Sequence, residues 1–377
     1  MKKHFKFSMV SIAVSFFMAN QAGAANTWTE ARSDAMGGTG VAAGSYGSGA
    51  LINPALLAKS KPEDDVTVIL PSVGVQVTDE DNLQDEIDTI NDKINHYKDV
   101  VDSLTPIEVI TNPLGSINQF QGAAKDLADE LDYLKGKTAH ATAGAGIAVS
   151  IPNDVLSVAF MAKGYAHGRV SSSIDQQDID YLRGIQRSDA VAAGVALDAA
   201  LNGTDQITKN LNSTASGRAA IVSDYGIAAD FGENWTVGVS GQNLMSRDID
   251  TKDIRIRNGR TGEVVSYKDT YQIRPLVTAG AAWHNDLVTL TADGDLTETK
   301  GFKSEDTSQY VGVGAEVTPL SWLAVRAGYR ADMKGNDSNV FTGGVGFAPF
   351  NAVHVDLMGL YGEDETWGAG AQLSMTF

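Results

Sequence analysis

The chain has 377 residues, a formal net charge of −18 and no cysteine. The lack of cysteine excludes a disulfide-stapled domain, a CxxC redox enzyme and a cysteine-based metal site. The acidic charge argues against nucleic acid as a partner, because nucleic-acid binding requires basic patches.

Residues 1–24 have the features of a signal peptide. Three lysines among the first six residues give a basic start, residues 7–19 are mostly apolar, and Ala22-Gly23-Ala24 fits the small-residue rule for cleavage. The apolar run is too short for a membrane helix, and no other window approaches about 18 apolar residues. We therefore expect an exported chain with a mature start at Ala25 and no helical membrane anchor.

Residues 25–65 precede the first expected strand. The part from residue 30 to 58 is rich in glycine and alanine and has too little bulk for a core of its own. Small residues permit close backbone packing in a narrow lumen, and Asn53 can cap a short helix that Pro54 opens. This segment is expected to plug the barrel that the following strands predict.

Twelve strand-like segments follow residue 66, each with apolar residues alternating with small or polar ones. In the segment 321–331, Leu323 and Val325 fall on one face and Arg326 on the other. This period of two is typical of strands with one apolar face. The expected strands are 66–77, 140–151, 154–171, 218–231, 234–248, 270–283, 286–298, 308–318, 321–331, 339–348, 351–361 and 366–377.

The connections between these strands alternate in length. Two-residue connections such as Pro152-Asn153 alternate with longer ones, which are 78–139, 172–217, 249–269, 299–307, 332–338 and 362–365. Outer-membrane barrels have short periplasmic turns and long extracellular loops, whereas a soluble β-sandwich gives no reason for the alternation. We therefore predict an all-β transmembrane barrel over 66–377, in the outer membrane of a Gram-negative bacterium. It has about twelve antiparallel strands, with fourteen as the alternative; a soluble periplasmic β-protein is the fallback.

Two insertions break the strand pattern. Residues 80–136 carry apolar residues in steps of three and four on both sides of a Pro-containing bend, which predicts an antiparallel hairpin of two amphipathic helices. Residues 174–217 show the same spacing more weakly, with one or two shorter helices around 179–185 and 192–199. If the chain enters the barrel from the periplasm, every long connection falls on the outer side. Both insertions are therefore expected outside the cell. We interpret the hairpin as a cap on the barrel. The alternatives are that it binds a partner by its exposed face or that it is an inert insertion.

Charged residues on the polar rows of the strands are expected to line the lumen. Ion pairs that fix the plug to the wall are the simpler interpretation, and a polar lining that selects solutes is the alternative. The predicted luminal residues are Arg274, Asp293, Asp295, Glu316, Arg326, Arg330, His354 and Asp356.

The last expected strand ends on Phe377, which shares an apolar row with Trp367 and Met375. Barrel closure should pair it with the strand at 66–77. Terminal strands of this kind commonly signal the barrel-assembly machinery, which makes that machinery an expected partner and Phe377 the expected assembly signal. The usual pattern has glycine five residues before the last aromatic, where this chain has Gln372.

No arrangement of residues supports catalysis or metal binding. No two of the six histidines have metal-ligand spacing, and no Ser–His pair shares an apolar row, as a barrel phospholipase would require. Asp293-Gly294-Asp295 lacks the other ligands of a calcium loop, and the glycine-rich 36–49 lacks the ending of a phosphate loop. We expect a non-enzymatic protein without a metal or cofactor.

Two motifs in the plug carry a family resemblance. Arg32 with Met36-Gly37-Gly38-Thr39-Gly40, followed by Asn53-Pro54-Ala55, resembles the N-terminal hatch of FadL-type transporters of hydrophobic compounds. The order of hatch, one strand, helical hairpin, second helical loop and hairpins resembles the TraF-type outer-membrane barrels of conjugal transfer. The hatch residues that the resemblance implies are Arg32, Met36, Gly37, Gly38, Gly40, Asn53 and Pro54.

The resemblances imply two competing functions. The TraF-type layout implies a non-enzymatic protein of conjugal transfer or of the cell surface, with a surface or conjugation protein as its partner. The FadL-type hatch implies instead a passive transporter of small hydrophobic compounds, which pass by way of the hatch and a lateral opening in the wall. FadL-type barrels have fourteen strands, and the twelve counted in this chain depart from that pattern. In both cases the barrel is surrounded by outer-membrane lipid.

Overall fold

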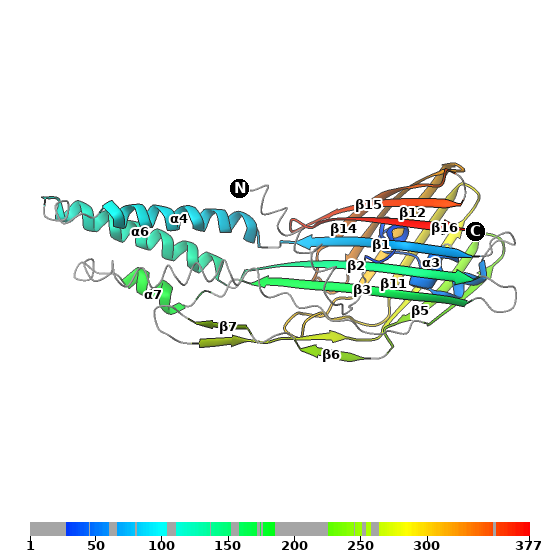
Figure 1. Ribbon diagram of the computed structural model, residues 1–377, viewed down its shortest axis with the longest axis horizontal. Helices are drawn as coiled ribbons and strands as arrows, with labels where there is room; N and C mark the ends of the chain where they lie inside the picture. The colour runs from blue at the N-terminus through cyan, green and yellow to red at the C-terminus, as the bar shows by residue number, and fades with distance from the viewer. Residues whose placement is uncertain are drawn as a thin grey trace.

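The computed structural model (Figure 1) describes residues 28–44, 46–59, 66–79, 81–103, 111–135, 137–151, 158–171, 174, 176–184, 225–244, 246–250, 254–257, 264–349 and 352–377. The predicted signal peptide at 1–24 and the helix predicted around 192–199 lie outside these residues.

Within the described residues, twelve antiparallel strands form one large sheet, as the alternation of apolar and polar residues predicts. The order of the strands is β3-β2-β1-β16-β15-β14-β13-β12-β11-β10-β5-β4. Their bounds are β1 Thr67–Thr78, β2 Thr138–Ile151, β3 Val158–Ser171, β4 Tyr225–Phe231, β5 Trp235–Gln242, β10 Leu276–His284, β11 Val288–Asp295, β12 Tyr310–Leu320, β13 Leu323–Asp332, β14 Val340–Phe347, β15 Val353–Gly362 and β16 Trp367–Thr376.

The first and last strands in chain order, β1 and β16, pair with each other in the sheet. Thr67 pairs with Thr376, and Val77 pairs with Trp367 at the other end of the ladder. Beyond β16, backbone hydrogen bonds connect Val66 and Phe377 in both directions. The edges of the sheet are therefore β3 and β4, and within the described residues no ladder joins them. We call the boundary between these two strands the seam.

Side chains alternate between the two faces along each strand. In β15, Asp356, Met358 and Leu360 are buried, whereas Leu357 and Tyr361 are exposed. Large apolar side chains are exposed in the same way on most other strands of the sheet. An outer surface this apolar needs lipid rather than water around it, so the fold is a transmembrane β-barrel.

The long predicted strand at 234–248 is interrupted. Asn243 adopts a left-handed backbone with φ of 52° and ends β5, and the chain then forms β6 (Arg247–Asp250), which pairs with β9 (Thr270–Ile273). Pro275, which has no N–H to donate, separates β9 from β10. Between these lies a second small ladder of β7 (Ile254–Arg257) and β8 (Val264–Tyr267). The predicted connection 249–269 therefore contains the β7–β8 ladder, and each of the predicted strands beside it, 234–248 and 270–283, is divided into two strands.

The predicted helical hairpin consists of α4 (Leu83–Ser103) and α6 (Pro113–Leu134), and α7 (Gln176–Gly184) packs beside α6. The Asn112 side chain accepts a hydrogen bond from the Gly115 amide and so caps α6, which Pro113 opens. The hairpin has its own core, in which the rings of Tyr97 and Phe120 lie 5.6 Å apart. Figure 1 shows the hairpin beyond the end of the barrel opposite to the C-terminus. Among the described helices none is both long and apolar enough to span a membrane.

The segment before β1 lies against the inner face of the sheet (Figure 1). It consists of α2 (Ala31–Asp34), α3 (Tyr46–Ile52) and the 3-10 helix η1 (Pro54–Lys59). We call residues 28–59 the plug. Helix α2 contacts β14, β15, β16 and β1, helix α3 contacts β1, β2 and β3, and η1 contacts β3 and β4.

Candidate functional site

The plug approaches the wall where the wall strands carry glycine. Gly37 has φ of 75°, and a Cβ built on Gly328 of β13 would lie 2.2 Å from its amide nitrogen. A Cβ on Gly314 of β12 would lie 2.4 Å from the carbonyl oxygen of Met36. Only glycine permits backbones to come this close. The wall is therefore shaped to receive the Met36-Gly37 turn.

Polar groups of the wall hold the turns of the plug. The Asp293 Oδ2 atom accepts hydrogen bonds from the amides of Gly40 and Val41, at 2.7 and 2.8 Å. Asn53 accepts from the Ala55 amide at 3.1 Å, as a helix cap does, and its Nδ2 donates to the carbonyl oxygens of Val41 and of Ile227 in β4. Asn53 therefore connects two parts of the plug to one edge of the seam.

A chain of buried ion pairs joins α2 to three wall strands. Arg32 donates to both carboxylate oxygens of Glu316 in β12, from Nε at 3.0 Å and from Nη2 at 2.7 Å. Arg326 of β13 donates to the same Glu316 and to Asp356 of β15, each at 2.6 Å. Charge-assisted pairs of this kind fix orientation as well as position. They anchor α2 to the wall on the side of β12 to β15.

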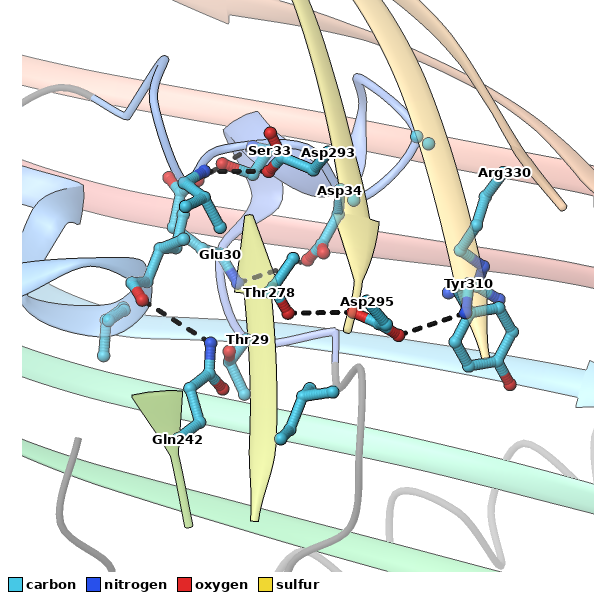
Figure 2. Close-up of a pocket in the computed structure, with 17 residues that line it drawn as sticks. Thr29, Glu30, Ser33, Asp34, Gln242, Thr278, Asp293, Asp295, Tyr310 and Arg330 are labelled. Carbon is cyan, nitrogen blue, oxygen red and sulfur yellow. Dashed lines mark hydrogen bonds between the residues drawn. The ribbon is translucent and has the colours of Figure 1, made fainter. Parts of the chain in front are cut away.

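A polar cavity of about 60 Å³ lies between the plug and the ends of the strands that lead into the long connections (Figure 2). We call it the plug cavity. Its lining includes four carboxylate side chains, those of Glu30, Asp34, Asp293 and Asp295, and one cationic side chain, that of Arg330. Thr278 donates to Asp295 at 2.8 Å, and the Tyr310 amide donates to it at 3.1 Å.

Arg330 lies between two aromatic rings. Its guanidinium carbon is 4.4 Å from the centre of the Trp28 ring and 4.8 Å from that of Tyr310. One terminal nitrogen donates to Gln76 Oε1 at 3.0 Å. Ring faces and an amide therefore hold this buried cation. Burial raises the pKa of the Asp34 carboxyl well above its usual value, and the neighbouring Glu30 carboxylate raises it further.

A second cavity, of about 300 Å³, lies at the end of the barrel with the short turns. We call it the turn-side cavity. Arg32, Glu316, Arg326, His354 and Asp356 contribute its charged or titratable lining together with Glu30, and the turn between β12 and β13 contributes apolar side chains. Glu30 also lines the plug cavity and is the one described residue common to the two linings.

The structure gathers most of the predicted luminal residues inside the barrel. Asp293, Asp295, Glu316, Arg326, Arg330 and Asp356 are all buried, and His354 lines the turn-side cavity. Arg274 is different, because it lies between β9 and β10 and its guanidinium pairs with Asp248 of β6 at 2.6 Å. That position places it in the small ladder, away from the luminal ion pairs.

Of the predicted hatch residues, Arg32, Met36, Gly37, Gly40 and Asn53 make the wall contacts described above, and Gly38 lines the plug cavity. Pro54 opens η1. The side chain of Phe377 is exposed, and its backbone pairs with Val66.

Several site residues were missed from the sequence. Glu30, Asp34 and Trp28 lie in the glycine-rich plug, where no periodicity singles them out. Gln76 and Gln372 could have been found, since both fall on the polar rows of their strands. Gln372 donates to Glu30 Oε1 at 3.1 Å and accepts from the Ala31 amide at 3.2 Å.

On the opposite side of the lumen the contact between plug and wall is apolar. Leu51 of α3 and Leu57 of η1 pack with Ile69 of β1 and Ala148 of β2. Ala159 and Met161 of β3 border this cluster. The plug is therefore fixed by charges near β12 to β15 and by apolar packing near β1 to β3.

In the part of the chain that the structure describes, these features define a plugged antiparallel β-barrel, and two cavities lie beside its plug. The family model described as "F plasmid transfer operon, TraF, protein" matches residues 50–231 and 223–295, which together exceed half of the chain. The chain belongs to this family. No curated protein matches it.

Solved structures similar to this chain include other barrels. One is the CymD monoaromatic hydrocarbon channel, with 11% identity, a TM-score of 0.49, and coverage of 93% of this chain and 97% of that chain. Another is the toluene transporter TbuX of Ralstonia pickettii, with 11% identity, a TM-score of 0.46, and coverage of 93% and 99%.

Proposed function

We propose that the protein is a passive route for small hydrophobic molecules across the outer membrane of a Gram-negative bacterium. The observation that carries this proposal is the seam. Strands β3 and β4 have no ladder between them in the described residues, and the plug element η1 contacts both strands from inside. A wall boundary that a movable segment covers can open sideways into lipid without unfolding the rest of the barrel.

The chemistry near the seam suits an apolar solute. Phe160 of β3 and Ile227 of β4 present their side chains outward, and the two residues are 69% and 71% exposed. Inside, the apolar cluster around Leu51 and Leu57 borders Ala159 of β3. A hydrophobic molecule that moves along this contact exchanges one apolar surface for another.

The plug is held in a way that fits such a route. The buried ion pairs of Arg32 and the amide contacts to Asp293 anchor one side of the plug to β11, β12 and β13. Near β1 to β3 the plug packs through the apolar cluster around Leu51, and apolar packing tolerates small displacements better than hydrogen-bonded pairs do. Motion of η1 near the seam would therefore leave the anchors on β11, β12 and β13 in place and would have to release the Asn53 hydrogen bond to Ile227 of β4.

Two phenylalanine substitutions in β3 test the route. Ala159→Phe adds bulk at the apolar contact, whereas Ala162→Phe adds the same bulk on the exposed face of the same strand. Entry of a fluorescent naphthylamine probe into cells should slow with Ala159→Phe and stay unchanged with Ala162→Phe. Equal rates for the two variants, at equal amounts of folded barrel, would refute a route beside β3.

A second candidate function rests on the helices. The hairpin of α4 and α6 has its own core and extends beyond the barrel. The description of the family names a plasmid transfer operon. We propose as the alternative that this hairpin contacts a surface or conjugation protein. Deletion of residues 80–136 should then reduce mating efficiency while barrel assembly continues. Normal mating with the deleted protein would exclude this function.

A further inference from the structure

The plug cavity contains more negative charge than its one cationic side chain can balance. Glu30, Asp34, Asp293 and Asp295 contribute carboxyl groups, and none of them has a cationic side chain within 4.0 Å among the described residues. The guanidinium of Arg330 lies against the rings of Trp28 and Tyr310, and its charge acts on Asp34 and Asp295 from beyond 4.0 Å. Four carboxyl groups therefore face one arginine across this cavity.

Among the residues that the structure describes, three buried polar atoms of the plug-cavity lining have no hydrogen-bond partner. They are Asp293 Oδ1, Ser33 Oγ and Arg330 Nε. Only 7% of the Asp293 residue is exposed, so bulk solvent does not satisfy its free oxygen. Buried polar groups of this kind are normally satisfied by bound water. About 60 Å³ is enough for a few water molecules, each of which needs roughly 10–15 Å³.

Glu30 is placed between the two luminal cavities. Its Oε2 accepts from the Ser33 amide at 2.8 Å, and its Oε1 accepts from Gln372 at 3.1 Å. The carboxylate is therefore held at the N-terminal end of α2, where the plug cavity and the turn-side cavity meet. A fixed carboxylate at a polar constriction attracts cations and repels anions.

We propose that the plugged lumen contains a water-filled path for small cations, with Glu30 at its constriction and Asp293 as a second selecting carboxylate. The ligand class is a hydrated monovalent cation such as K⁺. This path is separate from the hydrophobic route at the seam, because it runs through the polar side of the lumen. It does not depend on the plug leaving the barrel.

Ion selectivity in a planar lipid bilayer tests the proposal. The purified full chain should carry a small current that favours K⁺ over Cl⁻ in a KCl gradient. Glu30→Gln and Asp293→Asn should each lower the K⁺ to Cl⁻ permeability ratio severalfold. Asp293→Asn keeps an oxygen that can accept from both the Gly40 and Val41 amides, and Glu30→Gln keeps one oxygen for the Ser33 amide while its new amide group faces Gln372. Each variant tests the path independently if the other fails to fold.

The matched control is Glu233→Gln, which makes the same charge change in the exposed turn between β4 and β5. It should leave the permeability ratio unchanged. Replacing K⁺ by tetrabutylammonium should abolish the current, because that cation is too large for the plug cavity. The proposal is overturned by an absent or non-selective current, by a tetrabutylammonium current, or by unchanged selectivity in both Glu30→Gln and Asp293→Asn.

Discussion

Arg32 of the plug and Glu316 of β12 form a buried pair with two hydrogen bonds, of 3.0 and 2.7 Å. Because Arg326 uses the same carboxylate, Glu316→Gln leaves two buried guanidinium groups without their shared partner. Removing one member of a buried ion pair costs about 3–5 kcal/mol. Glu316→Gln should therefore loosen the plug strongly.

A cysteine at Ala35 measures this loosening, because Ala35 is 0% exposed and the chain has no cysteine of its own. In Glu316→Gln its maleimide labelling should accelerate by about two orders of magnitude or more, since each 1.4 kcal/mol is a factor of ten. Glu298→Gln, which breaks an exposed pair with Lys334, should leave labelling unchanged. Slow labelling in Glu316→Gln would mean that the pair does not hold the plug.

Gly328→Ala should prevent the plug from seating. The added methyl would lie 2.2 Å from both the Gly37 nitrogen and the Met36 carbonyl carbon, and neither backbone atom can move without displacing the turn. Gly294→Ala in β11 is the matched control, because a Cβ there meets nothing within 4 Å. Trypsin should cleave the plug of folded Gly328→Ala protein and spare that of Gly294→Ala. Equal resistance would show that the Met36-Gly37 turn does not need this glycine.

Phe120→Ala should unfold the helical hairpin while the barrel stays folded. Phe120 is buried against Tyr97 in a core that the helices form among themselves, and a buried Phe→Ala change costs about 3–5 kcal/mol. Hydrogen exchange should accelerate in α4 and α6 and stay slow in β1 and β16. Leu114→Ala, at a residue that is 58% exposed, should change neither. Faster exchange in the strands as well would mean that the hairpin and the barrel unfold together as one cooperative unit.

Asp34→Asn should stabilise the protein at neutral pH. The raised pKa of Asp34 means that the folded state favours the protonated form, so wild-type stability falls as pH rises from the ordinary value of 3.8 toward the raised pKa. Asparagine imitates the protonated acid and can still accept from the Glu30 amide. The midpoint of thermal unfolding should be higher for Asp34→Asn at pH 7, and the two proteins should converge below pH 3.8. A lower midpoint for the variant at pH 7 would contradict this pKa direction.

The sheet was predictable from sequence because its two faces meet different solvents. Alternation in 351–361 and 366–377 predicted the faces of β15 and β16, and closure of the barrel predicted the pairing of β1 with β16. The break after Gln242 was missed because its signals are single residues. Asn243 tolerates a left-handed backbone and Pro275 lacks an N–H, but neither changes the period.

The partners within the lumen could not be predicted in the same way. Sequence placed Glu316 and Asp356 on inward rows, yet which of them meets Arg32 depends on the height and rotation of the plug. The plug sequence has no regular spacing of apolar residues from which that rotation could be predicted. Glu30 and Asp34 were missed for this reason, although burial makes them central to the plug cavity.

The most direct measurement of the central claim is the rate at which a small hydrophobic probe crosses the outer membrane with and without this protein. Cells that produce the chain should take up a fluorescent naphthylamine faster than cells that lack it, while uptake of a polar dye of similar size stays the same in both. Equal naphthylamine rates at confirmed levels of folded barrel would contradict the proposed hydrophobic route.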